Sequence, residues 1–177
     1  MRTLNAVSVL VALAVAGAAS AQDVKVDYDK AASFAPIKTF SLKLGTAWGN
    51  PIGEKRVVSE IEEALMAKGW TKAEEGKADA QVVLHGATET KRTLNTFYSG
   101  MGGYRYRGFG GTGTATTTAS EYTVGTLVVD VFDAKSKQLL WRGIAQDELK
   151  DKPEKREKQL QKASEKLFKD FPPGSAK

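Results

Sequence analysis

Cysteine is absent from this 177-residue chain, and histidine occurs only once, at position 85. The absence of cysteine excludes a disulfide framework, a thiol nucleophile, a cysteine metal site and lipid attachment through an N-terminal cysteine. One histidine without cysteine partners gives no recognisable metal-ligand set, so we interpret His85 as a structural residue. The sequence also lacks the glycine-lysine-serine/threonine ending of a P-loop and a recognisable nucleophile with its base. We therefore expect no enzymatic activity, no cofactor and no metal site.

Long apolar runs are missing too, apart from one near the N-terminus. Arg2 gives a short basic start, residues 6–16 are apolar but too few to span a bilayer, and Ala19-Ser20-Ala21 has the small-x-small pattern that signal peptidase accepts. We interpret residues 1–21 as a signal peptide cleaved after Ala21, and residues 22–177 as a single domain without a transmembrane segment. This predicts a periplasmic protein, with secretion to the medium as the alternative.

Composition is that of an ordinary soluble domain. The chain is 41% hydrophobic and 27% charged, with a formal net charge of +5. This small positive net charge favours binding to acidic surfaces in general, but it is too small to identify a partner.

Residues 122–147 contain the clearest hairpin in the sequence. Residues 126–132 are rich in β-branched and aromatic side chains, with Leu127, Val129 and Val131 on one face, which predicts a strand with that face in the core. Asp133 can accept hydrogen bonds from amides two and three residues on, which favours a turn before a second strand from 138. In that pairing Arg142 lies opposite or diagonal to Asp130.

The remaining elements follow from periodicity and capping residues. Alternating apolar residues predict strands over 24–28 and 40–44, and an apolar run predicts another over 81–90. Asn50-Pro51 and Gly69 are typical of the two ends of a helix over 51–68. A charged helix with a narrow apolar stripe is expected over 152–169, followed by a frayed tail at 172–177. We expect an α+β fold: an antiparallel sheet of five or six strands with two helices packed on one face.

Residues 94–119 mix closely spaced glycines with aromatic and arginine side chains, and they predict a loop or an extended hairpin tip. Flexible aromatic and guanidinium groups also suit binding to sugars, aromatic partners or a lipid interface. RNA binding fits these residue types as well, but the expected export argues against nucleic acid. The residues that we select as ligand or partner contacts are Tyr98, Tyr104, Arg105, Tyr106, Arg107 and Phe109.

The functional prediction is a non-enzymatic envelope protein that binds a periplasmic protein, a glycan or a lipid head group. The alternative is a structural or assembly subunit acting through a sheet edge or the C-terminal helix. The sequence leaves the oligomeric state open.

Short motifs recur along nearly the whole of residues 22–177. They are Asp27-Tyr28-Asp29, Phe34, Lys38-Thr39-Phe40, Ala64-Leu65, Lys68-Gly69-Trp70, Tyr122, Gly125-Thr126-Leu127, Asp130, Asp133-Ala134-Lys135, Trp141-Arg142-Gly143 and Phe171-Pro172-Pro173. In this order they resemble the DUF4136 family of bacterial envelope proteins. The resemblance implies an α+β envelope domain, often lipid-anchored, and it offers no active site to transfer. This chain departs from that pattern because it lacks the lipid-bearing cysteine.

Overall fold

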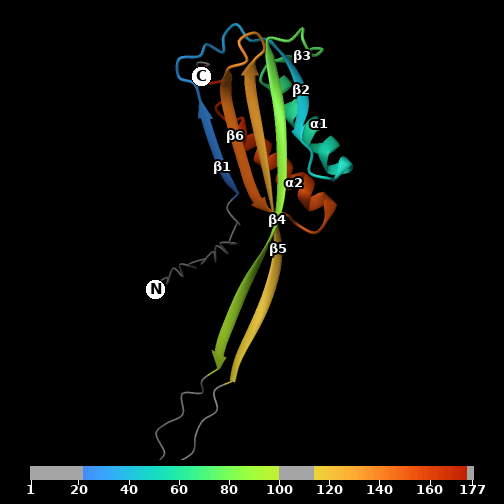
Figure 1. Cartoon of the computed structure of the whole chain (residues 1–177), viewed down its shortest axis with the longest axis vertical. Helices are drawn as coiled ribbons and strands as arrows, with labels where there is room; N and C mark the ends of the chain where they lie inside the picture. The colour runs from blue at the N-terminus through green and yellow to red at the C-terminus, as the bar shows by residue number, and fades with distance from the viewer. Residues whose placement is uncertain (1–21, 100–113, 175–177) are drawn as a thin grey trace, which may run out of the picture.

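A computed structural model describes residues 22–99 and 114–174, which form one sheet and two helices (Figure 1). The elements are β1 (Asp23–Tyr28), β2 (Thr39–Thr46), α1 (Pro51–Ala67), β3 (Thr71–Lys72), β4 (Ala80–Ser99), β5 (Thr114–Asp133), β6 (Leu139–Glu148) and α2 (Pro153–Leu167). The fold is α+β, as the sequence predicts.

The six strands form a mixed sheet in the order β1-β6-β5-β4-β2-β3. The expectation of a purely antiparallel sheet is wrong, because β2 pairs in parallel with both β3 and β4. The reason is the connection after β2: the chain returns to the sheet through helix α1, and a helical crossover brings the next strand back in the same direction.

The hairpin of β5 and β6 adopts one of the two registers that the sequence left open. Asp130 lies opposite Arg142, and the Asp133 carboxylate accepts hydrogen bonds from the amides of Lys135 at 2.9 Å and Ser136 at 2.6 Å. Val129 and Val131 are fully buried. Leu127, the third residue of the predicted row, is partly buried and packs against the core. The predicted core-facing row and turn are therefore confirmed.

Helix α1 begins and ends where the sequence predicts. The Asn50 side chain accepts a hydrogen bond from the amide of Gly53, and Pro51 is the first helical residue. At the other end Gly69 has φ of +87°, and the amides of Gly69 and Trp70 donate to the carbonyls of Met66 and Leu65. This bond pair is a Schellman motif, which satisfies the last carbonyls of the helix.

Both helices cover the same face of the sheet, and the core lies between the two layers (Figure 1). Aromatic rings close this core at one end of the sheet, where residues 168–171 follow α2. Phe171 makes edge contacts with Trp70 at 5.0 Å and with Trp141 at 5.2 Å between ring centroids, and Trp141 stacks on Phe168 at 5.4 Å. Such pairs add stability beyond their buried area. They explain why the chain stays packed as far as Phe171, beyond the end of α2.

The tail after Phe171 is described only in part. Pro172 and Pro173 are half-buried and Gly174 is exposed, while residues 175–177 lie outside the described part of the chain.

Strands β4 and β5 are longer than the sequence suggests. β4 runs from Ala80 to Ser99 rather than ending near 90, and the two strands pair continuously from Ala80↔Asp133 to Ser99↔Thr114. Both ends of the segment predicted as a loop, 94–99 and 114–119, are thus strand. Past the body of the domain these strands form a two-stranded ribbon that projects away from it, which we call the β4–β5 ribbon, residues 90–99 and 114–123 (Figure 1).

Candidate functional site

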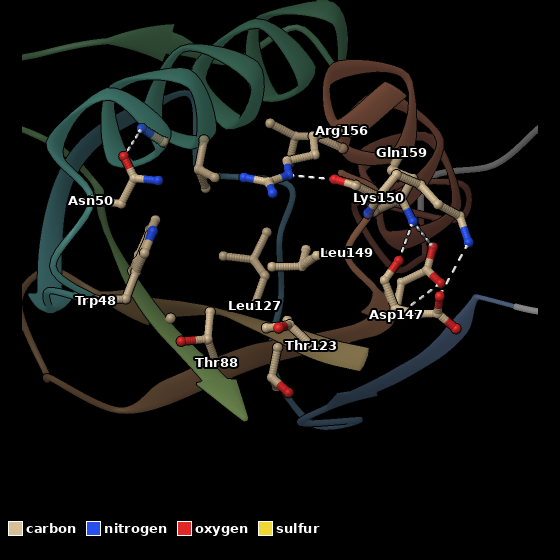
Figure 2. A pocket seen from close by; sticks show the side chains of 18 of the residues that line it. Trp48, Asn50, Thr88, Thr123, Leu127, Asp147, Leu149, Lys150, Arg156 and Gln159 are labelled. Atoms are coloured by element: carbon tan, nitrogen blue, oxygen red, sulfur yellow. Dashed lines mark hydrogen bonds and ion pairs between the residues drawn. The ribbon is translucent and has the colours of Figure 1, made fainter. Parts of the chain in front are cut away.

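A cavity of about 960 Å³ opens at the end of the domain from which the β4–β5 ribbon departs. Its floor is the helix-side face of β4, β5 and β6, and its walls are the first turns of α1 and α2 (Figure 2). This size is at the upper end of the usual range for small-molecule sites, which are concave, mostly apolar and supplied with a few polar groups.

Two glycines in the floor create the shape of the cavity. A Cβ on Gly86 would overlap the Trp48 ring, and a Cβ on Gly125 would lie 2.7 Å from a methyl carbon of Leu149. Glycine inside a strand often marks such close approach. These positions therefore let Trp48 and Leu149 lie directly on the sheet, on either side of Leu127 (Figure 2).

The helix starts supply one apolar and one charged part of the wall. Ile52, in the first turn of α1, is 67% exposed although its side chain is aliphatic. Arg56 of α1 and Glu157 of α2 form an ion pair at 3.3 Å, which links the two helices at the cavity. The pair is about half exposed, so it contributes little to stability. It does place charge beside an uncovered apolar side chain.

Gln159 closes the wall between α2 and the end of β6. Its amide nitrogen donates to the Asp147 carboxylate at 2.8 Å and to the Glu148 carbonyl at 2.7 Å, while its amide oxygen accepts from the Lys150 amide at 3.1 Å. Arg156 also donates to the Lys150 carbonyl, and Figure 2 shows its guanidinium group lying between the two helices above Leu127. The polar groups of this wall are thus held in place by hydrogen bonds.

Trp48 is fixed by the start of α1. Its amide donates to the Glu54 carboxylate at 3.0 Å, and its indole is half-buried against Gly86. Of the three tryptophans it is the one that lines the cavity, because Trp70 and Trp141 are buried in the core. Thr88 and Thr123 add hydroxyl groups to the floor below it (Figure 2).

Within residues 22–99 and 114–174, no group of three or more histidine, cysteine, aspartate or glutamate side chains is placed to hold a metal ion. His85 lies on the opposite face of the sheet, packed over Gly45, with Nδ1 3.0 Å from the Thr46 hydroxyl.

Three groups in the described part of the chain have shifted pKa values, and each lies away from the cavity. The backbone amide of Lys38, with the hydroxyl and amide of Thr39, lowers the pKa of Asp79. The amide and hydroxyl of Ser136 lower the pKa of Asp133, and hydrogen bonds to Asp130 raise the pKa of Arg142. Each shift is explained by a turn or a strand contact, so none of them points to an acid or base in the cavity.

The contact residues predicted from the sequence are not brought to this cavity. Tyr98 is part of β4 near the far end of the β4–β5 ribbon, and its side chain is outside the described part of the structure. Tyr104, Arg105, Tyr106, Arg107 and Phe109 lie in residues 100–113, also outside the described residues. Sequence reasoning missed the cavity, although Gly86 and Gly125 inside strand-like segments were a usable sign of it.

Comparison with solved structures finds the same fold in other bacterial proteins. A PDZ domain protein from Parabacteroides distasonis matches with a TM-score of 0.52 and 15% identity, over 86% of this chain and 36% of that one. The chain therefore spans about a third of that protein's length. PelC from Paraburkholderia phytofirmans, described as a dodecamer, matches in two crystal forms with TM-scores of 0.51 and 0.50 and 12% identity. These matches cover 84% of this chain and 95% of PelC. Identities this low show the fold alone.

Sequence comparison gives the family. A search of curated proteins found no match. The model of the DUF4136 family, described as a domain of unknown function, matches residues 24–173, which include every described helix and all the strands except the first residue of β1. The chain therefore belongs to the DUF4136 family.

Proposed function

We propose that this protein is a non-enzymatic, exported binding module whose cavity takes an amphipathic component of the cell envelope. The observation that carries the proposal is the cavity between the first turns of α1 and α2. Aliphatic side chains and the Trp48 indole line it, together with polar side chains that hydrogen bonds hold in place. Export rests on the signal-peptide pattern of residues 1–21. Among the described residues no helix has the length and apolarity to cross a bilayer.

A lipid is the ligand class that this lining fits best. Leu127, Leu149 and Ile52 offer aliphatic surface to an acyl chain, while Arg56 and Gln159 lie where a polar head group would remain hydrated. Burying apolar ligand surface on these residues supplies the favourable term, at about 25 cal/mol per Å². A glycan is the second class, since the Trp48 ring and the hydroxyls of Thr88 and Thr123 suit sugar rings.

Tryptophan fluorescence of the mature chain tests the proposal. The probe is a single-chain lysophospholipid below its critical micelle concentration, and a soluble peptidoglycan oligosaccharide is the parallel arm. Binding should change the emission of Trp48, and Trp48→Phe should remove that change because Trp70 and Trp141 are buried.

A matched pair of variants locates the site. Thr88→Phe fills the cavity from its floor, whereas Glu89→Phe places the same ring on the other face of the same strand. We expect Thr88→Phe to weaken lysophospholipid binding at least about tenfold, a loss of roughly 1.4 kcal/mol, with no change in Glu89→Phe. Equal affinities in the two variants would contradict the cavity as the site. If the oligosaccharide binds and the lysophospholipid does not, the ligand class is a glycan and not a lipid.

An assembly role is the second candidate function. PelC, which shares this fold over 95% of its length, is described as a dodecamer. The long projecting ribbon of this chain gives a surface for such a role, and sedimentation of the mature chain tests it. The selected residues Tyr98, Tyr104, Arg105, Tyr106, Arg107 and Phe109 remain predicted contacts for a partner.

A further inference from the structure

The β4–β5 ribbon has a long free edge. β2 pairs with β4 only as far as His85, so from Gly86 to Ser99 no further described strand lies against the outer edge of β4. On the β5 side the free edge is shorter, because β6 pairs up to Val124 and the Leu149 amide donates to the Thr123 carbonyl. An edge of this length offers a row of unpaired backbone amides and carbonyls to another strand.

The ribbon is poorly supported as a separate element. Its ten residue pairs, from Thr90↔Thr123 to Ser99↔Thr114, extend about 30 Å beyond the covered sheet. Neither helix covers it (Figure 1). A two-stranded ribbon alone is marginally stable in water, and a third or fourth strand is what stabilises it.

The outer edge of β4 also lacks most of the features by which edge strands avoid pairing with strands of other molecules. It contains no proline and no bulge within the described pairs, and Leu94 near its middle is 68% exposed. Natural edge strands are protected by proline, bulges or charge, and here the charges are confined to Glu89, Lys91 and Arg92 near the base. The half of the edge from Thr93 onward is uncharged.

We propose that this edge pairs with the same edge of a second copy of the chain, antiparallel and centred on Leu94. Two identical strands in antiparallel pairing are related by a two-fold axis perpendicular to the sheet, so the residue on the axis faces its own copy. With Leu94 on the axis, the two exposed leucines meet. Arg92 then faces Thr96 rather than another arginine. Glu89 faces Ser99, the last residue of β4, so the paired segment ends at Glu89 and does not reach His85, where β2 pairs with β4. The result is a four-stranded ribbon with a domain at each end.

Sedimentation and disulfide trapping of the mature chain test the pairing. We expect a dimer of wild type in analytical ultracentrifugation. Leu94→Glu places two like charges face to face, and it should raise the dissociation constant roughly a hundredfold. The unfolding midpoint should not change when both proteins are measured at a concentration where they are monomeric. Ala119→Glu is the control, because Ala119 pairs with Leu94 inside one copy and lies on the far strand of the dimer.

The absence of native cysteine makes trapping specific. Leu94→Cys should form an intermolecular disulfide on mild oxidation, since facing Cα atoms in an antiparallel pair are about 5 Å apart. Ala119→Cys should not, because its two copies would be separated by three strand spacings, about 14 Å. A monomer at every concentration with no Leu94→Cys disulfide overturns the proposal. So does a dimer that Leu94→Glu leaves intact, since the interface then lies elsewhere.

Discussion

Replacing Arg142 with methionine tests the charged pair that joins β5 and β6. Asp130 is 2% exposed, and its two carboxylate oxygens accept bonds from Arg142 at 2.6 and 2.7 Å. Methionine keeps much of the aliphatic stem but removes both donors. His85 Nε2, 4.0 Å from Asp130, is too far to replace either bond. The substitution therefore leaves a buried carboxylate without its partner.

The expected loss of stability in Arg142→Met follows from the burial of Asp130 and the partial exposure of Arg142. Breaking a fully buried ion pair costs about 3–5 kcal/mol. The Arg142 side chain is 46% exposed, so water screens the pair and compensates part of the loss. We expect Arg142→Met to lower the free energy of unfolding by about 2 kcal/mol, which is a fall of roughly 4–8 °C in Tm for a domain of this size.

Urea denaturation followed by tryptophan fluorescence measures this loss, because Trp70 and Trp141 report on the core. The double variant Asp130→Val with Arg142→Met supplies the control. Replacing both charges by apolar groups is often near neutral, so the double variant should recover most of the lost stability. A single variant as stable as wild type, or a double variant no better than the single one, would refute this reasoning.

Three further substitutions test the core, the helix end and a turn. Trp141→Asp should cost about 3 kcal/mol or more, since the ring is fully buried and stacked on Phe168; thermal melting at the wild-type temperature would contradict this. Gly69→Val should lower the free energy of unfolding by about 1–2 kcal/mol in the same urea titration. The loss comes from backbone strain alone, because no atom lies near the added Cβ. Gly69→Asn should lower it by less, since asparagine tolerates this backbone conformation better. The Lys38 and Thr39 bonds lower the pKa of Asp79 from 3.8, so their stabilising effect is present above that pH and is lost as pH falls through the folded pKa. Asp79→Asn should therefore lose less stability between neutral pH and pH 3 than wild type does; equal pH dependence would contradict it.

The features predicted correctly from the sequence are determined by short-range interactions. Asp133 reaches amides two and three residues away, and Gly69 ends α1 through bonds to the last turn of the same helix. The Asp130–Arg142 pair follows from one hairpin register. Each depends on residues that are close in sequence, so pattern and capping chemistry suffice to predict them.

The features that were missed depend on contacts between distant segments. The parallel pairing of β2 with β4 depends on where α1 returns the chain, and periodicity within a strand carries no information about that direction. The cavity needs Trp48 to lie on Gly86 and Leu149 to lie on Gly125, which are contacts across 38 and 24 residues of sequence. Glycine in a strand indicates that something approaches closely, but not which side chain does so.

The two ends of the sheet are closed differently. At one end Phe171 and its aromatic neighbours close the gap between sheet and helices. At the other end β2 leaves β4 after His85 and β6 stops at Glu148, and the N-terminal parts of both helices line a cavity above the sheet. The same loss of neighbouring strands leaves an uncovered floor on one side and a free edge along β4. The cavity and the proposed pairing edge therefore begin at the same end of the sheet, where Thr88 lines the cavity floor and Glu89 begins the edge that would pair.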